Sequence, residues 1–424
     1  MPNNEYKKTI SEFGLIGTSD EVQNANKFLS AQVAHVVYQE LEAFAKTDSG
    51  KDVLGFAGNG KYLQAKSYVG TIQTKSGFIL EILPKTVNDD KPEDSKKIFM
   101  KLLHLLHKLP NYKNIDTANF ERIKNIDIFE IFIVMFLDEV GQIIKKGIKS
   151  DYSSREDNLF FLKGKLKFNE HIKQNSIHKE RFYVEYDDYN QNRPENRLIK
   201  STLQLLSKLS KDFQNIRRIR LYMEHMNWVE SSMNVDNDFR SMKLGRGMEH
   251  YRYALIWSKV FLKKESFSSF SGETIAFAIL YPMEKLFESF VEWYLNKTES
   301  DFNVIAQSGE HDFVCNDKKR LFGVRPDFLL KQGEVVKCVA DAKWKLIDKE
   351  ADFSQGDFYQ LFAYKNIFLK NNTDDDRNLR IYYPKTEFLK GEIVYKYFDG
   401  GKINIIPLDI KDELSKSKTN DQNE

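Results

Sequence analysis

Two aspartates and a lysine stand at the ends of two predicted strands in the C-terminal third of the sequence. Asp327 follows Pro326 in one apolar strand, and Asp341 closes a second apolar strand 14 positions later, with Lys343 two residues beyond it. Side chains two apart in a strand share a face, so Asp341 and Lys343 point the same way. Two carboxylates can hold a hard divalent cation that stabilises negative charge on a phosphate, and a lysine can position or deprotonate water or stabilise the anion. This spacing predicts a metal-dependent site for phosphodiester hydrolysis.

Two predicted helices flank these strands. Residues 280–297 have an amphipathic pattern that aligns three carboxylates beside its apolar stripe: Glu284, Glu288 and Glu292. Residues 354–369 place three polar side chains on one face: Asp357, Gln360 and Tyr364. A helix glutamate, a strand Pro-Asp, a strand Asp-x-Lys and a helix glutamine, in that order, are the layout of the PD-(D/E)xK nuclease superfamily. In the competing interpretation, the two aspartates are strand-end residues without a catalytic role and the lysine is a surface group.

Composition excludes several classes of protein. The 64 Lys and Arg against 62 Asp and Glu give a formal net charge of +2, so local patches rather than a global basic field would have to hold nucleic acid. No apolar run approaches the roughly 18–20 residues that a bilayer requires, and the N-terminus lacks a secretion signal. We therefore expect a cytoplasmic protein without membrane contact. Cys315 and Cys338 lie in predicted strands without metal-binding spacing and are expected to be reduced, buried thiols.

The pattern of the first 270 residues changes from β-rich to helical. A helix is predicted over 20–46, and the segment 53–85 alternates short strands with glycine turns. Its GFAGNGK run resembles part of a phosphate-binding loop, but Tyr62 stands where Ser or Thr would ligate magnesium and a strand follows, which favours a hairpin. Further helices are predicted near 126–144, 195–211 and 248–264, and paired strands over 152–168 around Gly164.

We expect an α+β multidomain chain. Residues 1–110 form an N-terminal β-rich region and 111–270 a mainly helical middle region that ends in a linker at 266–272. Residues 271–410 form an α/β PD-(D/E)xK nuclease core with a mixed central sheet flanked by helices. The tail 411–424 is expected to be disordered.

Several separated blocks resemble the McrC family, the nuclease subunits of McrBC-type and LlaJI-type restriction systems. The resemblance spans about residues 53 to 400, whereas the first 50 residues or so match no block. Its blocks, in chain order, are Val69 to Thr74 with Leu80 to Lys85, Gly164 to Leu166, Asn196 to Lys200, Met283 to Val291, and Asp357 to Tyr364. Blocks in the right order along most of the chain are far more specific than a single Asp-x-Lys string.

The resemblance implies a DNA-cleaving subunit of a McrBC-like restriction system. Such a subunit is a Mg²⁺-dependent endodeoxyribonuclease without its own motor, activated by an McrB-like AAA+ GTPase hexamer whose GTP hydrolysis it stimulates. That partner binds the GTP, and the N-terminal region, residues 1–110, would dock on its ring. The substrate would be double-stranded DNA, with or without methylated bases.

The resemblance also assigns roles to individual residues. The catalytic positions are Asp327, Asp341, Lys343, Glu288 and Gln360, of which Asp327, Asp341 and Glu288 would hold the metal. Two other functions remain open from the sequence: an autonomous PD-(D/E)xK nuclease in DNA repair, and a non-enzymatic assembly subunit that only stimulates a GTPase.

Overall fold

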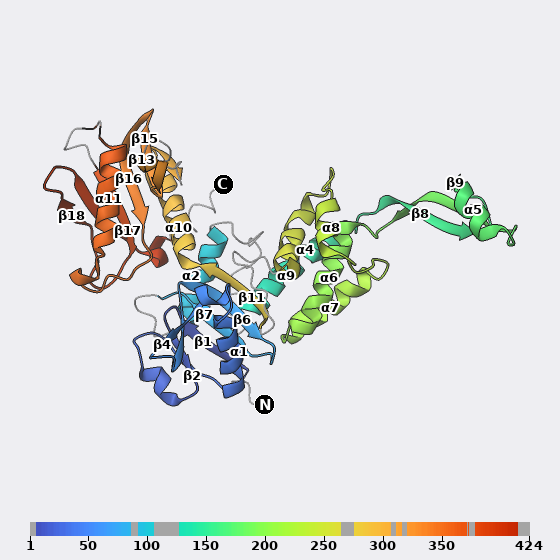
Figure 1. Cartoon of the computed structure of the whole chain (residues 1–424), viewed down its shortest axis with the longest axis horizontal. Helices are drawn as coiled ribbons and strands as arrows, with labels where there is room; N and C mark the ends of the chain where they lie inside the picture. Colours follow the sequence, from blue (N-terminus) through green and yellow to red (C-terminus); the bar gives the residue numbers. More distant parts are fainter. Residues whose placement is uncertain are drawn as a thin grey trace. The chain divides into compact units, whose positions relative to one another are not determined.

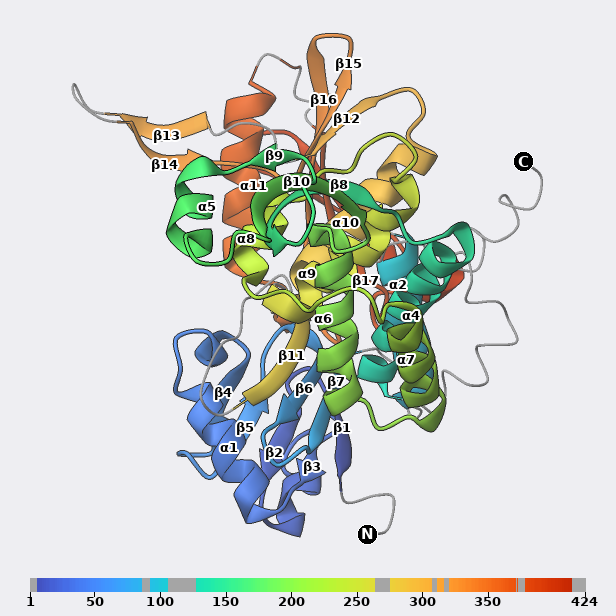
Figure 2. The same ribbon diagram turned by 90° about the vertical axis from the view of Figure 1, so that its right-hand side faces the viewer.

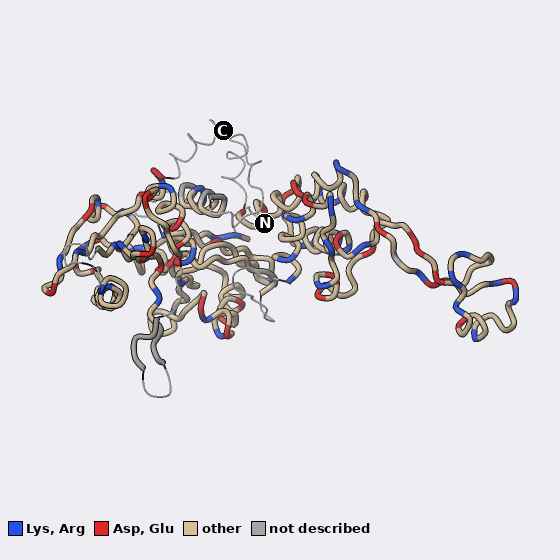
Figure 3. The backbone as a smooth tube through the Cα atoms, turned by 90° about the horizontal axis from the view of Figure 1, so that it is seen from above, with Lys and Arg blue, Asp and Glu red and all other residues tan. Residues whose placement is uncertain are grey.

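A computed structural model describes residues 6–85, 92–105, 127–263, 275–306, 311–315, 320–370, 372 and 378–413. The chain forms two compact units (Figure 1): a two-segment unit that combines Met1–Leu109 with Phe270–Glu424, and an inserted unit, Pro110–Ser269. Lys and Arg are interspersed with Asp and Glu along both units (Figure 3), in keeping with the small net charge. Within the described residues, no helix has the length and apolarity needed to cross a bilayer.

The N-terminal part of the two-segment unit contains two four-stranded sheets. The first has the order β1-β7-β6-β11 and the second β3-β2-β5-β4. Apolar side chains of both sheets and of α1 share one core, including Ile72, Leu80, Leu63 and Leu41. The elements are β1 (Lys7–Ser11), β2 (Leu15–Gly17), β3 (Ala31–Gln32), α1 (His35–Ala45), β4 (Leu54–Ala57), β5 (Tyr62–Ala65), β6 (Tyr68–Thr74), β7 (Ile79–Leu83), α2 (Pro92–Leu105) and β11 (Ile275–Pro282), with 3-10 turns η1 (Asp20–Asn24) and η2 (Gly50–Asp52).

The single helix predicted over 20–46 is wrong. Only η1 and α1 are helical in that stretch, and β3 lies between them. Asn26 Oδ1 accepts a hydrogen bond from Phe28 N at 2.9 Å, and Ser30 Oγ accepts one from Leu15 N at 2.9 Å. These bonds offer the backbone partners other than helical carbonyls, which is why the apolar periodicity does not produce a continuous helix.

The hairpin predicted for GFAGNGK is confirmed. β4 and β5 pair antiparallel from Leu54↔Ala65 to Ala57↔Tyr62. The connecting turn needs positive φ at Gly58 (59°), Asn59 (56°) and Gly60 (85°), and such angles are accessible to Gly and Asn.

The inserted unit is a helical body built around aromatic side chains. α4 buries nearly all of its length, and its Phe132 and Phe136 lie against Trp257 and Phe261 of α9, with ring centroids 5.6 and 5.9 Å apart. Gly147, at φ 88°, follows the last residue of α4. The helices are α4 (Ile128–Lys146), α6 (Pro194–Leu209), α7 (Phe213–His225), α8 (Val235–Ser241) and α9 (Arg252–Lys263), with the 3-10 turn η4 (Glu249–Tyr251).

A two-stranded arm extends from these helices (Figure 1), and Figure 2 shows it end-on. It pairs β8 (Asp151–Leu159) with β10 (Phe182–Asn190), and its end carries β9 (Lys165–Leu166) and α5 (Phe168–Asn175). The pairing predicted within 152–168 is therefore wrong, because the partner of β8 comes from beyond α5. Gly164 has φ 73°, and a Cβ there would lie 2.4 Å from the Glu185 carbonyl oxygen, so the glycine permits close approach to β10 rather than marking a hairpin turn.

The C-terminal part of the two-segment unit is a mixed six-stranded sheet of order β12-β15-β16-β17-β19-β18. β15, β16 and β12 are antiparallel neighbours, whereas β16, β17 and β19 run parallel. Leu361 and Tyr364 of α11 pack with Val339 on one face, and Phe287 and Tyr294 of α10 contact Trp344 and Tyr382 on the other. The elements are α10 (Met283–Thr298), β12 (Asn303–Ala306), β13 (His311–Cys315), β14 (Arg320–Val324), β15 (Phe328–Gln332), β16 (Val335–Ala342), η5 (Glu350–Asp352), α11 (Gln355–Phe368), β17 (Asn378–Pro384), β18 (Ile393–Lys396) and β19 (Lys402–Leu408).

The domain boundary predicted at residue 271 does not separate the next strand, β11, from the N-terminal sheets. β11 pairs with β6 of the first N-terminal sheet, and α10 begins at Met283, directly after the last residue of β11. The predicted linker 266–272 lies outside the described residues. So does most of the predicted tail, although Lys411 to Glu413 continue a helical turn that begins at Ile410.

Candidate functional site

The hairpin of β15 and β16 brings Asp327 and Asp341 together. Phe328 pairs with Ala340, so the residues just outside that pair face each other across the strands. Asp327 Oδ2 accepts a hydrogen bond from Ala342 N at 2.9 Å, which fixes one carboxyl beside the strand that carries the other. Gly333, at φ 59°, lies in the turn that joins the two strands.

Lys343 supplies a cation to this acid pair. Its Nζ lies 2.6 Å from Asp341 Oδ2, and the side chains of the two residues are 22% and 3% exposed. Lys343 N also donates to Tyr382 O at 2.9 Å, which keeps the residue in line with β17 although β16 ends at Ala342. The alternation predicted from the sequence therefore places Asp341 and Lys343 on the same side of the strand.

The pKa values of these groups reflect burial and mutual charge. Burial and the neighbouring Asp341 carboxylate raise the pKa of Asp327 to about 7. Burial also raises the pKa of Asp341, although Lys343 opposes this. Burial lowers the pKa of Lys343, but the two aspartates more than offset that effect and raise it. Lys343 is therefore a protonated cation at neutral pH, and the acid pair resists carrying two negative charges.

Glu288 approaches the acid pair without contacting it directly. Its carboxylate pairs with Lys285 of the same helix, at 2.7 and 3.0 Å. Burial, followed by the charge of Asp327, raises the pKa of Glu288. Glu284, one of the other two carboxylates in the predicted row, instead raises the pKa of Glu12. The structure thus distinguishes Glu288 from Glu284, which the amphipathic pattern could not do.

Gln360 acts on the site through Tyr364. Gln360 Nε2 donates to the Tyr364 hydroxyl at 2.6 Å, and that hydroxyl donates to Arg325 O at 2.9 Å. Arg325 precedes the Pro326-Asp327 pair, so Gln360 and Tyr364 hold the backbone from which Asp327 projects. Burial and the charges of Asp341 and Asp327 raise the pKa of the Tyr364 hydroxyl.

Asp357, Lys345 and Tyr383 form a second polar cluster that the sequence-based assignment of catalytic residues missed. Asp357 accepts from Lys345 Nζ at 2.8 and 2.9 Å and from the Tyr383 hydroxyl at 3.0 Å. The Asp357 charge also reaches Asp341 and Lys343, where it raises both pKa values. The signal for Asp357 was its place on the same helix face as Gln360. No local pattern marked Lys345 or Tyr383.

Two carboxylates, rather than three, are assembled at the site. Among the residues that the structure describes, no group of three or more His, Cys, Asp or Glu side chains is close enough together to hold a metal ion. Asp327 and Asp341 are the adjacent pair, and Glu288 does not join them as a third ligand in this geometry. A cation held here would take most of its remaining ligands from water or substrate, as Mg²⁺ commonly does.

The match to a family model decides the family. The model described as "McrBC 5-methylcytosine restriction system component" matches residues 63–382. The chain belongs to this family. The McrC resemblance inferred from separated sequence blocks is thereby confirmed at the level of the family.

A solved structure shares the fold of this McrBC family member. It is a chain of the refined half-complex from a tetradecameric assembly of Thermococcus gammatolerans McrB AAA+ hexamers with bound McrC, at TM-score 0.67 and 18% identity, with 98% of this chain and 99% of that chain covered. A chain of the cryo-EM structure of the Thermococcus gammatolerans McrBC complex aligns at TM-score 0.48 and 18% identity, over 69% of this chain and 87% of that one. No curated protein matches the sequence.

Proposed function

We propose that this chain is the DNA-cleaving subunit of a McrBC-like restriction system and that its reaction is Mg²⁺-dependent phosphodiester hydrolysis. The observation that carries the proposal is the buried pair of Asp327 and Asp341 with the Lys343 ammonium 2.6 Å from Asp341, in a member of the McrBC family. The order of α10, the β15–β16 hairpin and α11 supports a PD-(D/E)xK core.

The acid pair fits a divalent cation. Asp341 Oδ2 is buried and has the Lys343 ammonium at 2.6 Å, and the pKa of Asp327 is raised to about 7 by burial and by Asp341. Two buried carboxylates that share one lysine can accept the further positive charge of a divalent cation. Asp327 and Asp341 would hold Mg²⁺, with Glu288 beside them. The ion would supply charge stabilisation for the phosphate and lower the pKa of water.

Each protein residue at the site then has a distinct role. Lys343, whose ammonium lies 2.6 Å from Asp341 Oδ2, is placed to stabilise negative charge that develops on the phosphate. Ala342 N orients Asp327 by a 2.9 Å hydrogen bond, and Gln360 with Tyr364 holds the backbone before it.

We further propose that an McrB-like AAA+ GTPase activates the chain, because the similar solved structure is of McrB AAA+ hexamers with bound McrC. The arm of the inserted unit offers a surface for such a partner. Apolar residues at its end, which we call the tip set, each expose 60% or more of their surface: Phe160, Phe161, Leu162, Phe168, Ile172 and Ile177. Exposed apolar side chains clustered in this way are typical of protein–protein contacts. From the sequence we expected docking through the N-terminal region instead, and that expectation stays a prediction.

The test combines purified chain, Mg²⁺ and the neighbouring AAA+ protein with GTP. We expect little cleavage by the chain alone and double-strand cleavage when partner and GTP are present. Asp341→Ala should abolish cleavage while stimulation of the partner's GTPase stays intact. Robust cleavage without partner would favour an autonomous nuclease, and cleavage that survives Asp341→Ala would refute the assignment of the site.

A further inference from the structure

A buried glutamate far away in sequence holds the residue next to Lys343. Glu12 lies in the turn between β1 and β2 and is fully buried. Trp344 Nε1 donates to both Glu12 carboxylate oxygens at 3.0 Å, and Lys85 N donates to Glu12 Oε2 at 2.9 Å. Trp344 follows Lys343 directly, so the N-terminal turn contacts the chain one residue from the proposed site.

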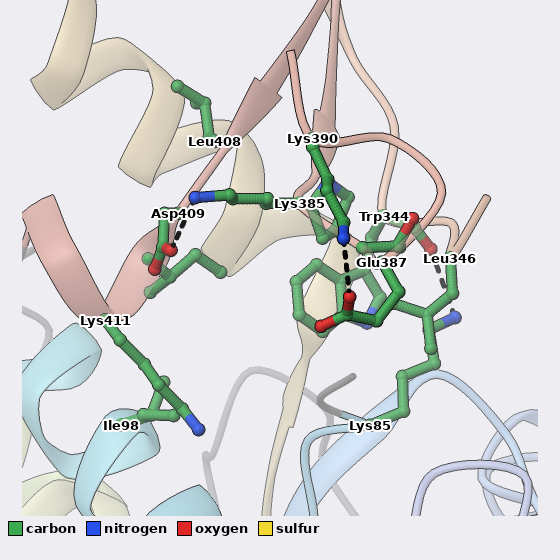
Figure 4. Close-up of a pocket in the computed structure, with 13 residues that line it drawn as sticks. Lys85, Ile98, Trp344, Leu346, Lys385, Glu387, Lys390, Leu408, Asp409 and Lys411 are labelled. Carbon is green, nitrogen blue, oxygen red and sulfur yellow. Dashed lines mark hydrogen bonds and ion pairs between the residues drawn. The ribbon is translucent and has the colours of Figure 1, made fainter. Parts of the chain in front are cut away.

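Lys85 strengthens the same contact. Its Nζ donates to Trp344 O at 3.2 Å and lies 4.3 Å from the centre of the Phe13 ring and 5.8 Å from that of Trp344. Phe287 of α10 also packs against Trp344, with ring centroids 5.3 Å apart. Trp344 is therefore held by its ring, its indole N–H and its carbonyl oxygen. Lys85 and Trp344 also line a cavity of about 430 Å³ (Figure 4).

The turn that presents Glu12 is held in an unusual backbone conformation. Phe13 has φ 61°, an angle that bulky residues rarely adopt. Phe13 N donates to Ala65 O at 3.1 Å, and Phe13 O accepts from Asn26 Nδ2 at 2.8 Å and from Gln64 Nε2 at 3.0 Å. A Cβ on Gly14 would lie 2.1 Å from Leu29 O. Strain that the surroundings enforce in this way is characteristic of functional positions.

We propose that Glu12 is a positioning residue of the site: by fixing Trp344, it sets the backbone on which Asp341 and Lys343 stand. The charged groups that act on Glu12 are Lys85, after β7, and Glu284, on α10. The hydrogen bonds of Glu12 described above go to Trp344 and Lys85, and its effect on the site passes through Trp344. The inference rests on the proposed function for its consequence in cleavage, but the positioning itself can be measured without cleavage.

Hydrogen exchange measures the positioning. In Glu12→Ala the indole N–H loses its acceptor, and a buried donor without a partner lowers the free energy of local opening. The amides of residues 342–345 should exchange about tenfold faster than in the wild type, whereas those of β17 should not change. Glu12→Gln keeps one acceptor oxygen and should exchange at an intermediate rate. Lys27→Ala is the matched control, because it breaks the exposed 2.7 Å ion pair with Asp348 in the same unit without touching Trp344.

Single-turnover cleavage by the complex with partner, GTP and Mg²⁺ measures the consequence. We expect a rate about tenfold lower in Glu12→Ala with unchanged DNA affinity, partial recovery in Glu12→Gln, and the wild-type rate in Lys27→Ala. Three results would overturn the inference: unchanged exchange at 342–345, a rise of equal size in β17, or faster local exchange with an unaltered cleavage rate. If the wild-type complex does not cut DNA, the proposed nuclease function fails, and the exchange experiment alone decides whether Glu12 positions this strand.

Discussion

Replacing Glu12 by glutamine should change how the stability of the chain depends on pH. Burial raises the pKa of Glu12 to about 7 from an ordinary value of 4.5, against the opposing effects of Lys85 and of the Trp344 hydrogen bond. The folded protein therefore binds this proton more tightly than the unfolded chain does. The resulting stability is fully present below about pH 4.5 and is lost as the pH rises towards 7.

The size of the effect follows from the difference between the two pKa values. Each unit of difference corresponds to about 1.4 kcal/mol, so the full contribution is about 3 kcal/mol. Between pH 5 and pH 8.5 the wild type should lose about 2–3 kcal/mol of this contribution. The glutamine of Glu12→Gln has no proton to release, so the variant should not lose this contribution to stability. Relative to the wild type, the variant should therefore gain stability steadily as the pH rises.

Urea unfolding at pH 5, 6, 7 and 8.5 measures this difference. The inserted unit is identical in both proteins, so its contribution cancels in the comparison. Glu21→Gln is the control, because it removes an exposed carboxyl of the same N-terminal region, and surface ion pairs contribute little to stability. Free energies of unfolding for wild type and Glu12→Gln that run parallel across the pH range would refute the reasoning.

Two further predictions concern the second polar cluster and the arm. Asp357→Asn removes the charge that Lys345 contacts at 2.8 and 2.9 Å. The variant should lower the rate of single-turnover cleavage about tenfold and the free energy of unfolding by about 1–2 kcal/mol. An unaltered cleavage rate in a folded variant would count against a role for this cluster. Replacing Phe168 and Ile172 at the arm tip by serine should weaken binding to the AAA+ partner at least tenfold in a pull-down titration, whereas the control Asp341→Ala should bind with wild-type affinity. Equal affinities of the serine variant and the wild type would exclude the tip set as a contact.

The sequence predicted the arrangement of Asp327, Asp341 and Lys343 at the β15–β16 hairpin because that arrangement is local. Two-residue alternation places Asp341 and Lys343 on one side of a strand, and a glycine turn joins strands that are close in sequence. Apolar periodicity likewise indicated α10 and α11. Such patterns do not show which carboxylate of a row faces the site: the family resemblance selected Glu288 over Glu284, and in the structure it is Glu288 that feels the charge of Asp327.

The roles of Glu12 and Lys85 could not be predicted, because they depend on contacts between distant segments. Glu12 and Trp344 are 332 residues apart, and Lys85 and Trp344 are 259 apart. A buried glutamate in an apolar N-terminal segment has no local signature that distinguishes it from an exposed one. The arm shows the same limit: β8 pairs with β10 across the intervening α5, whereas a local pattern favours the nearest turn.

The connection between β11 and α10 argues against a C-terminal sheet that moves independently of the N-terminal sheets. β11 is a strand of the first sheet, α10 starts at the next residue, and Met283 N donates to Ser67 O at 2.9 Å. Glu288 is therefore carried by a helix whose first turn is tied to the N-terminal part. Glu12 ties that part to Trp344 as well. Because both sides of the site are attached to the first N-terminal sheet or its flanking turn, a displacement of that sheet would move the helix carboxylate and the Asp341 strand together.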